Sequence, residues 1–198
     1  MPRLPRSLVA ALTLLVLFAS ANANATVLMH QTVEDLAAQS DLVVIGTVEG
    51  QWPEWDAENQ RLVTLTAFRI DQIVATSGEV REGEGQRIVI EQEGGFLPEE
   101  NWGVHVAGNA SLALGEHALL FLRRSEAPAE RYFIYGMELG KFHIEEGTTP
   151  ILHRSSTVPV VLMGLEGTPT MLEQSPSPYE GRPLDELLGD IENVGGAR

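Results

Sequence analysis

Cysteine is absent from this 198-residue sequence, and lysine is nearly absent, because Lys141 is the only one in the chain. Without cysteine the protein cannot form disulfides, build a zinc ribbon or use a thiol as a nucleophile. Its stability therefore has to come from a hydrophobic core, and the length suffices for one ordinary domain. No segment after residue 25 is apolar for long enough to be a transmembrane helix.

Positive charge is scarce, since 13 basic residues stand against 28 acidic ones and the formal net charge is −15. A surface of this sign repels the phosphates of nucleic acids, so nucleic-acid binding is not expected. It also disfavours docking on anionic membranes. The property that it favours is solubility.

The first 25 residues have the three parts of a secretory signal peptide. Arg3 and Arg6 give a positive start, Ser7–Phe18 is an uncharged apolar core, and Ala23-Asn24-Ala25 has small residues where a signal peptidase reads them. We expect cleavage after Ala25 and a secreted or periplasmic protein, with a retained N-terminal anchor helix as the alternative. Cleavage removes two arginines, so the net charge of the mature chain becomes 11 − 28 = −17.

Local patterns predict one short helix and then mostly strands. Thr32 is suited to be the N-cap of a helix over Thr32–Ser40, which has acidic residues in its first turn. A change of apolar phase within the long strand Arg61–Val74 predicts a bulge or strong coiling. Strands are expected from period-two alternation or continuous apolar runs at Leu42–Val48, Arg61–Val74, Arg87–Glu91, Glu116–Arg123 and Ile151–His153.

The second half of the chain is less regular. Gly94–Leu112 is expected to be a long loop with a short strand near Gly103–Val106, and Arg131–Met137 is expected to form a hairpin with Gly140–Ile144. A segment rich in proline and glycine follows over residues 156–182. Pro183–Val194 then predicts a helix with an apolar stripe, which we expect to dock on the domain rather than on a partner.

Together these elements predict a mainly β fold. We expect a small antiparallel OB-like barrel of about five or six strands over residues 26–155, because closing a sheet protects its edges. A short N-terminal helix precedes it, and a C-terminal amphipathic helix over residues 183–194 follows it.

The order of several motifs carries a resemblance. Gln39–Val48, with the sequence QSDLVVIGTV, is followed by the long strand, by Ile88-Val89-Ile90 with Gly94-Gly95, by Leu114-Gly115-Glu116, and by Gly140-Lys141-Phe142. Over Val33–Ile144 this order resembles secreted bacterial proteins whose core is similar to the OB-fold of netrin-like and tissue-metalloproteinase-inhibitor domains. The resemblance implies the fold. The animal inhibitors bind a protease zinc through an N-terminal cysteine, which this chain lacks, so their inhibitory apparatus does not carry over.

No motif arranges the polar residues for catalysis or metal binding. The sequence has no HExxH and no G-x-S-x-G, and no ligand spacing relates its five histidines, which are His30, His105, His117, His143 and His153. Four alternating polar residues could ligate calcium, but without the EF-hand pattern a solvated acidic turn is preferred; they are Glu54, Asp56, Glu58 and Asn59. We therefore expect no catalytic residues, no metal and no cofactor.

Three tryptophans are the strongest candidates for a partner-binding site. Trp52 and Trp55 lie in a predicted turn over Gly50–Gln60 that leads into the long strand, and Trp102 lies in the predicted loop. Large aromatic side chains can anchor a binding partner, or they can cap the open end of a barrel. The sequence thus predicts a non-enzymatic domain that binds a protein or glycan partner, with an inhibitor-like role as one version. The alternative is an exported hydrolase whose histidine and carboxylate groups are assembled by folding.

Overall fold

A computed structural model describes residues 27–29, 31–77, 80–126, 131–154, 161–163, 169–170 and 179–195. The predicted signal peptide and most of segment 156–182 lie outside these ranges. Among the described residues, no helix combines the length and the apolar character needed to cross a membrane.

The described chain is mainly β, with two α-helices, as the sequence predicts. Two further features are minor: one turn of 3₁₀ helix over Met137–Gly140, and a small sheet of the three short strands Val27–Met29, Val161–Met163 and Pro169–Thr170. In chain order the elements are β1 (Val27–Met29), α2 (Val33–Gln39), β2 (Leu42–Asp56), β3 (Arg61–Thr76), β4 (Arg87–Glu93), β5 (Gly95–Leu97), β6 (Trp102–Val104), β7 (His117–Arg124), β8 (Arg131–Ile134), η1 (Met137–Gly140), β9 (Lys141–Glu145), β10 (Ile151–His153), β11 (Val161–Met163), β12 (Pro169–Thr170) and α3 (Leu184–Gly195).

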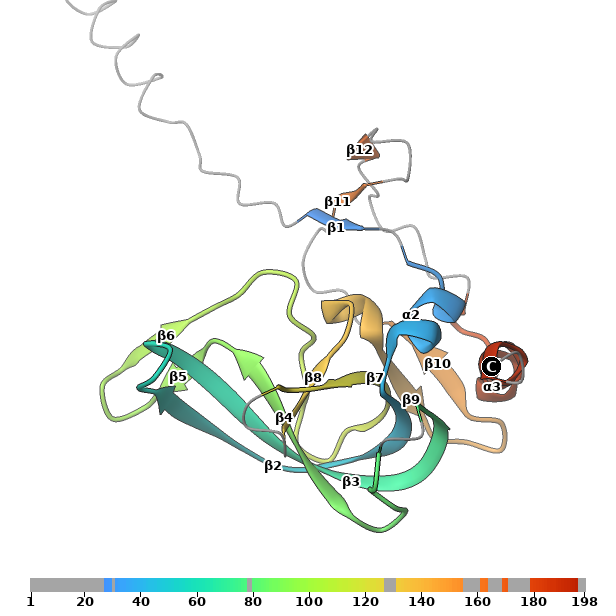
Figure 1. Cartoon of the computed structure of the whole chain (residues 1–198), viewed down its shortest axis with the longest axis horizontal. Coiled ribbons are helices and arrows are strands. Elements are labelled where there is room, and N and C mark those ends of the chain that lie inside the picture. The colour runs from blue at the N-terminus through green and yellow to red at the C-terminus, as the bar shows by residue number, and fades with distance from the viewer. Residues whose placement is uncertain are drawn as a thin grey trace, which may run out of the picture.

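The main sheet has seven strands in the order β10-β9-β7-β2-β3-β4-β8, and β8 also pairs with β7. Every pairing in it is antiparallel except that of β4 with β8, which is parallel. The pairing of β4 with β8 thus departs from the predicted antiparallel arrangement, and the sheet has seven strands where five or six were expected in a barrel. Periodicity reports which residues share a face, and it carries no information about which distant strand will be the neighbour. Figure 1 shows how strongly the long strands of this sheet curve.

The N-terminal helix forms where it was predicted, because its first turn is capped. The Thr32 hydroxyl accepts a hydrogen bond from the Asp35 amide at 3.1 Å, and the Asp35 carboxylate accepts one from the Thr32 amide at 3.2 Å. This reciprocal capping box satisfies two donors that the helix itself leaves free. Leu36 is fully buried, so the short helix is held mainly by packing in the core that it shares with α3 and the sheet.

Strand β2 is longer than predicted. It was expected to end at Val48 and to give way to a turn over residues 50–60, but it continues to Asp56 and only residues 57–60 form the turn. Thr47 is the last residue of β2 that pairs with β7, and beyond it β2 pairs only with β3. An edge strand tolerates a proline, which explains how Pro53 fits inside it.

The predicted break in alternation is present, as irregularities in the β2–β3 ladder. The register shifts between Val43 and Val44, between Ile45 and Gly46, and between Val48 and Gly50. At the first two shifts the extra residue belongs to β3, namely Val74 and Asp71. At the last one, opposite the change of apolar phase at Ala67 and Phe68, the extra residue is Glu49 of β2. Bulges of this kind increase strand twist and curvature.

The predicted hairpin of residues 131–137 with 140–144 was wrong. Strand β8 pairs with Leu122–Arg124 and β9 pairs with Ala118–Leu120, so the two follow one another along the same edge of β7. The connection between them therefore has to kink rather than reverse. Gly140 permits the kink, because a Cβ at this position would overlap the backbone carbonyl oxygen of Tyr135.

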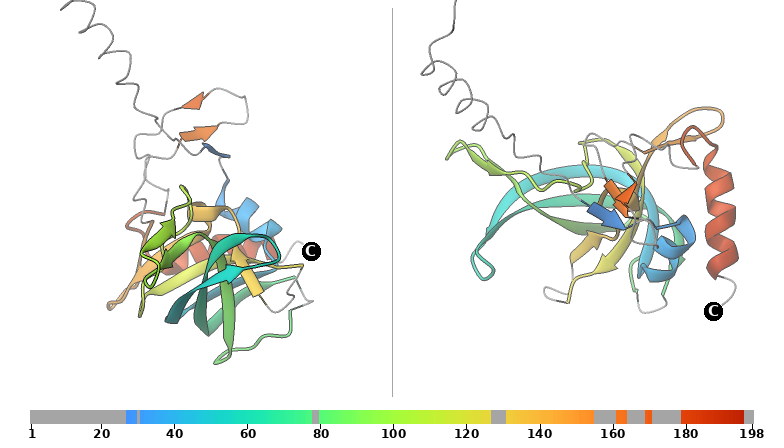
Figure 2. Two further views of the ribbon diagram at one scale, coloured as in Figure 1. Left: turned by 90° about the vertical axis from the view of Figure 1, so that its left-hand side faces the viewer. Right: turned by 90° about the horizontal axis from the view of Figure 1, so that it is seen from above.

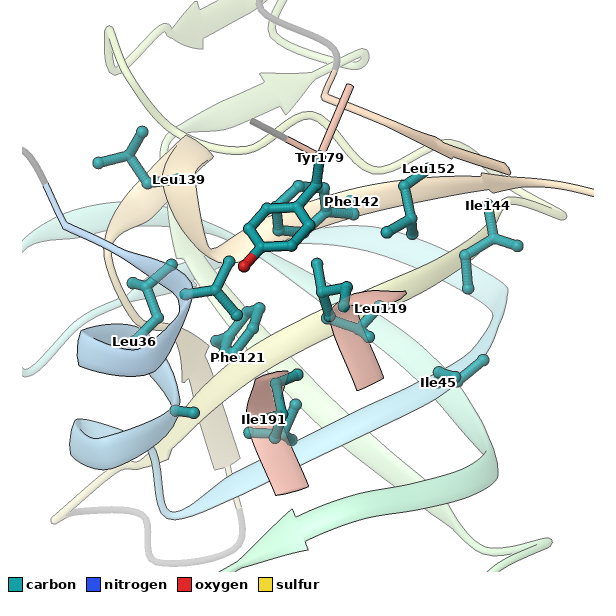
Figure 3. Close-up of a cluster of buried hydrophobic side chains, with 14 residues drawn as sticks. Leu36, Ile45, Leu119, Phe121, Leu139, Phe142, Ile144, Leu152, Tyr179 and Ile191 are labelled. Carbon is teal, nitrogen blue, oxygen red and sulfur yellow. The ribbon is translucent and has the colours of Figure 1, made fainter. Parts of the chain in front are cut away.

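Side chains from the two faces of the sheet form two hydrophobic cores. On β7, Leu120 points into one core and Phe121 into the other. This is expected for a strand that has apolar residues on both of its faces. The first core takes residues from β2, β3, β4, β7 and β8. The second lies between the outer face of the sheet and the two helices, and Figure 3 shows Leu36 of α2 and Ile191 of α3 within it. The apolar stripe of α3 thus docks within the chain, as predicted.

Candidate functional site

Two hairpins project from the same end of the molecule (Figures 1 and 2). One is the outer part of β2 and β3 with its turn at residues 57–60, and the other is β5–β6 with its turn at residues 98–101. The second hairpin replaces the long loop that the sequence predicted, although β6 overlaps the short strand expected there. It is tied to the first by a hydrogen bond from the Gly94 amide to the Leu62 carbonyl at 2.8 Å and one from the Thr64 hydroxyl to the Gly94 carbonyl at 2.9 Å.

The structure brings two of the three candidate tryptophans together. The rings of Trp55 and Trp102, one from each hairpin, are 6.3 Å apart between centroids and inclined at 63° in an edge-to-face contact. Both side chains remain 46% exposed. Rings so open to solvent do not act as a buried lid, so the exposure favours the binding-surface interpretation over the cap. We call Trp55, Trp102 and the turns 57–60 and 98–101 the tryptophan surface.

Trp52 is not part of the tryptophan surface. The ladder pairs Trp52 with Leu65 and Trp55 with Leu62, and successive side chains of a strand alternate between its faces. Three residues apart, Trp52 and Trp55 therefore lie on opposite faces of the hairpin. Trp52 is 41% exposed on its own face. Sequence reasoning grouped the two because it placed them in a turn, where alternation does not apply.

Sequence reasoning missed two exposed apolar residues near the tryptophan surface. Phe96 and Val104 of the β5–β6 hairpin are 53% and 40% exposed. They line a cleft of about 660 Å³ between this hairpin and the segment 105–112, together with polar groups that include His105 and Asn109. The available signal was a pair of short apolar runs, Phe96-Leu97 and Trp102-Gly103-Val104, on either side of a polar turn that begins with Pro98. It was overlooked because the segment was interpreted as a loop.

Arg61 binds three carboxylates beside the turn of the first hairpin. Its guanidinium donates to Asp56 at 3.0 Å, to Glu91 at 2.6 Å and to Glu93 at 2.9 Å. Asn59 also donates to Asp56, through its side chain at 2.8 Å and its backbone amide at 3.1 Å. The hydrogen bonds from Asn59, and after them the one from Arg61, lower the pKa of Asp56 to about 2. This carboxylate therefore stays ionised at any ordinary pH.

The four residues considered as calcium ligands do not converge. Asp56 binds Arg61, and Glu54 accepts from Arg131 at 2.9 Å. Glu58 lies in the exposed turn. Among the residues that the structure describes, no group of three or more histidine, aspartate or glutamate side chains could hold a metal ion.

Three histidines that are distant in sequence line up on neighbouring strands at the other end of the sheet. His143 of β9 is paired in register with His153 of β10, their ring centroids are 6.5 Å apart, and His117 precedes the β7 residue paired with His143. We call these three the histidine row. Their nearest charged partners are carboxylates, namely Glu146 and Asp71 for His117, Glu116 for His143, and Glu145 and Glu180 for His153. His105 is exposed elsewhere, and His30 lies outside the described residues.

The only lysine of the chain lies buried beside this row. Lys141 is 5% exposed, and its ammonium nitrogen is 2.7 Å from a carboxylate oxygen of Glu116. It also donates to the backbone carbonyl of Ser111. The second oxygen of Glu116 accepts from the Ala113 amide at 2.8 Å. The pair thus fixes segment 111–116 to β9, as a structural rather than a chemical element.

The interactions of His153 predict a pH-dependent stability. Its hydrogen bond with Glu180, at 3.0 Å, and the one with Glu145, at 2.9 Å, hold the pKa of His153 above its usual 6.5 against the opposing effect of burial. A group whose pKa is raised by folding stabilises the folded state. This contribution is complete at pH values below the pKa of the group in the unfolded chain, and it is lost as the pH rises through its pKa in the folded protein. His153→Gln should therefore lower the melting temperature at about pH 5.5 and leave it nearly unchanged at about pH 9.

The matched control for His153→Gln is His105→Gln, because His105 is exposed and lies away from the histidine row. Melting curves of both variants and of the wild type, recorded at the two pH values, test the prediction. A His153→Gln defect of equal size at both pH values would mean that the ion pairs with Glu145 and Glu180 do not stabilise the fold through protonated histidine.

Comparison with known proteins gives no relative: no protein-family model matches the chain, and neither does any curated protein. Function has to be inferred from the residues and their geometry.

Proposed function

We propose that this chain is a secreted, non-enzymatic binding domain with an OB-like barrel, and that it binds an exported protein or glycan through the tryptophan surface. The barrel part of the proposal is supported by the strand pairings. They run from β7 through β2, β3, β4 and β8 and return to β7, and all five strands contribute side chains to the first core. A ring of five strands with a filled interior fits an OB-like barrel. Strands β9 and β10 then extend the sheet beyond β7.

The position of the tryptophans agrees with this fold. In OB-folds the loop between the first two strands of the barrel often contributes to ligand binding, which is an argument by analogy. Here that loop is the extended outer hairpin of β2 and β3, which carries Trp55. The single observation that carries the proposal is the contact of two half-exposed tryptophans from separate hairpins.

The hydrolase alternative receives less support from the geometry. Its histidines do lie beside carboxylates in the histidine row, but a nucleophile has to meet them. Ser111, which adjoins this group, contributes its backbone carbonyl to Lys141 rather than its hydroxyl. The inhibitor-like version of the binding proposal rests on fold analogy alone, and any contact with a protease would have to use the tryptophan surface instead of a terminal cysteine.

The double variant Trp55→Ala/Trp102→Ala tests the proposed function. Removing two central aromatic anchors is expected to weaken partner binding by about 30-fold or more, because such residues commonly dominate interface energies. The measurement is affinity capture from periplasmic extract and culture medium, followed by titration of the captured partner. Circular dichroism should show an intact fold, because both rings are largely outside the two cores.

Trp52→Ala is the matched control, since Trp52 has similar exposure on the opposite face of the same hairpin. It should retain the partner. If the double variant retains the partner as well as the wild type does, the tryptophan surface is not the binding site. If the double variant instead unfolds, the two rings serve packing and the cap interpretation is the correct one.

A further inference from the structure

We infer, on the basis of the proposed function, that the partner is a basic polypeptide segment whose arginine or lysine side chains contact the two tryptophan rings and the carboxylates of the adjoining turns. The inference concerns the chemistry of the occupant of the tryptophan surface. It rests on the charges around that surface, the geometry of the two rings and the net charge of the chain.

The end of the molecule that bears the tryptophan surface has an excess of negative charge. Its two arginines are already engaged, since Arg61 and Arg131 between them bind Glu54, Asp56, Glu91 and Glu93. Three exposed carboxylates in the turns make no ion pair within the described part of the chain, and these are Glu58, Glu99 and Glu100. Two positive and seven negative side chains give a local sum of 2 − 7 = −5.

The unpaired carboxylates lie close to the two tryptophans along the chain. Glu58 lies in the turn that follows Trp55, and Glu99 and Glu100 lie in the turn that leads directly into Trp102. The face of an indole ring attracts a cation through its quadrupole, and tryptophan is the best of the aromatic side chains in this respect. A guanidinium or ammonium group at the Trp55–Trp102 contact would thus meet a ring face and find carboxylates in both neighbouring turns.

Ring geometry is compatible with a cationic side chain. The two rings are inclined at 63° and do not form one continuous flat face. A compact planar group such as a guanidinium needs the face of only one of them. Arginine also stacks on aromatic faces while it keeps its hydrogen-bond donors available for carboxylates.

Electrostatics disfavours the other classes of occupant. Nucleic acids and anionic lipid surfaces are repelled by the same local excess of negative charge that attracts a basic segment. A second copy of this chain has a formal net charge of −15 of its own, so self-association through this surface is opposed as well. A basic polypeptide is therefore the occupant whose charge complements this surface.

A titration with defined ligands tests the inference. The purified chain is titrated by calorimetry with a short peptide of alternating arginine and glycine, with the same peptide carrying neutral citrulline in place of arginine, and with an uncharged oligosaccharide. The arginine peptide should bind, the citrulline peptide should bind roughly tenfold more weakly or not at all, and added salt should weaken the arginine complex.

Two double variants locate the contact. Trp55→Leu/Trp102→Leu removes the rings, and Glu99→Gln/Glu100→Gln removes two charges from one turn. Each should weaken the arginine peptide by roughly fivefold or more. The matched control is Glu84→Gln/Glu192→Gln, which removes two exposed carboxylates elsewhere on the chain and should change binding by less than about twofold.

Each other outcome overturns the inference in a distinguishable way. Equal weakening by Glu99→Gln/Glu100→Gln and by the control means that the peptide responds to net charge alone. Binding of the oligosaccharide that depends on the tryptophans, without binding of the arginine peptide, refutes the basic partner and leaves the proposed function standing. Arginine-peptide binding that is unaffected by loss of both tryptophans refutes the surface itself. If Trp55→Leu/Trp102→Leu fails to fold, the comparison of Glu99→Gln/Glu100→Gln with its control, together with the citrulline peptide, still tests whether a basic peptide binds here.

Discussion

Replacing Lys141 with methionine is expected to lower the free energy of unfolding by about 3–5 kcal/mol. The Glu116 side chain is only 8% exposed, and the ammonium group of Lys141 is its ion-pair partner at 2.7 Å. Methionine fills much of the same volume but leaves the buried carboxylate without its ammonium partner, and the other basic neighbour, His143 at 3.3 Å, is a cation only when it is protonated. The cost arises from this uncompensated charge rather than from lost packing. Urea unfolding at neutral pH, followed by circular dichroism, measures it.

The double variant Lys141→Met/Glu116→Gln separates charge from shape. Because it removes both charges, it should recover more than about half of the loss seen in Lys141→Met alone. A single-variant loss below about 1 kcal/mol would show that the pair is no more than an ordinary surface salt bridge. So would a double variant that is less stable than Lys141→Met.

Gly46→Ala is expected to destabilise the protein by about 3 kcal/mol or more. A Cβ at position 46 would overlap the backbone carbonyl oxygen of Arg69 and lie 2.5 Å from Cε1 of Phe68. A side chain can rotate away from such an overlap, but the carbonyl belongs to β3, so β2 and β3 would have to separate. The contact occurs beside the register shift between Ile45 and Gly46, and a glycine within a strand often marks such a close approach of two backbones.

Gly50→Ala is the matched control, because it is in the same strand and its added Cβ would meet nothing within 4 Å. There alanine should be neutral or should stabilise by up to about 1 kcal/mol, since glycine is the less favourable residue within a strand. Chemical denaturation of both variants measures the difference. Equal stability of Gly46→Ala and Gly50→Ala would contradict the close approach of β2 and β3.

Local pattern was sufficient for the elements whose stability is decided locally. The capped first turn at Thr32, the long alternating strand β3 and the apolar stripe of α3 could all be predicted from the sequence. Pairings between distant segments could not be predicted, because the alternation of apolar and polar residues does not identify which strand lies beside which. The parallel contact of β4 with β8 and the succession of β8 and β9 along β7 are of that kind.

The same limit applied to the candidate site. The sequence indicated all three tryptophans, but only the register of β2 on β3 separates Trp52 from Trp55, and only the β5–β6 hairpin brings Trp102 to Trp55. The histidine row was invisible for a similar reason. His117, His143 and His153 have no motif spacing, and they meet because β7, β9 and β10 are neighbours in the sheet.

The most direct test of the tryptophan surface is a nuclear magnetic resonance titration that follows the indole N–H signals. The chain has three tryptophans, so a binding event is reported by three signals, one of which is an internal control. With the arginine peptide or a captured partner, the Trp55 and Trp102 signals should shift together and the Trp52 signal should stay in place. A shift confined to Trp52, or no shift of any indole signal in a complex known to form, would contradict the assignment of partner binding to Trp55 and Trp102.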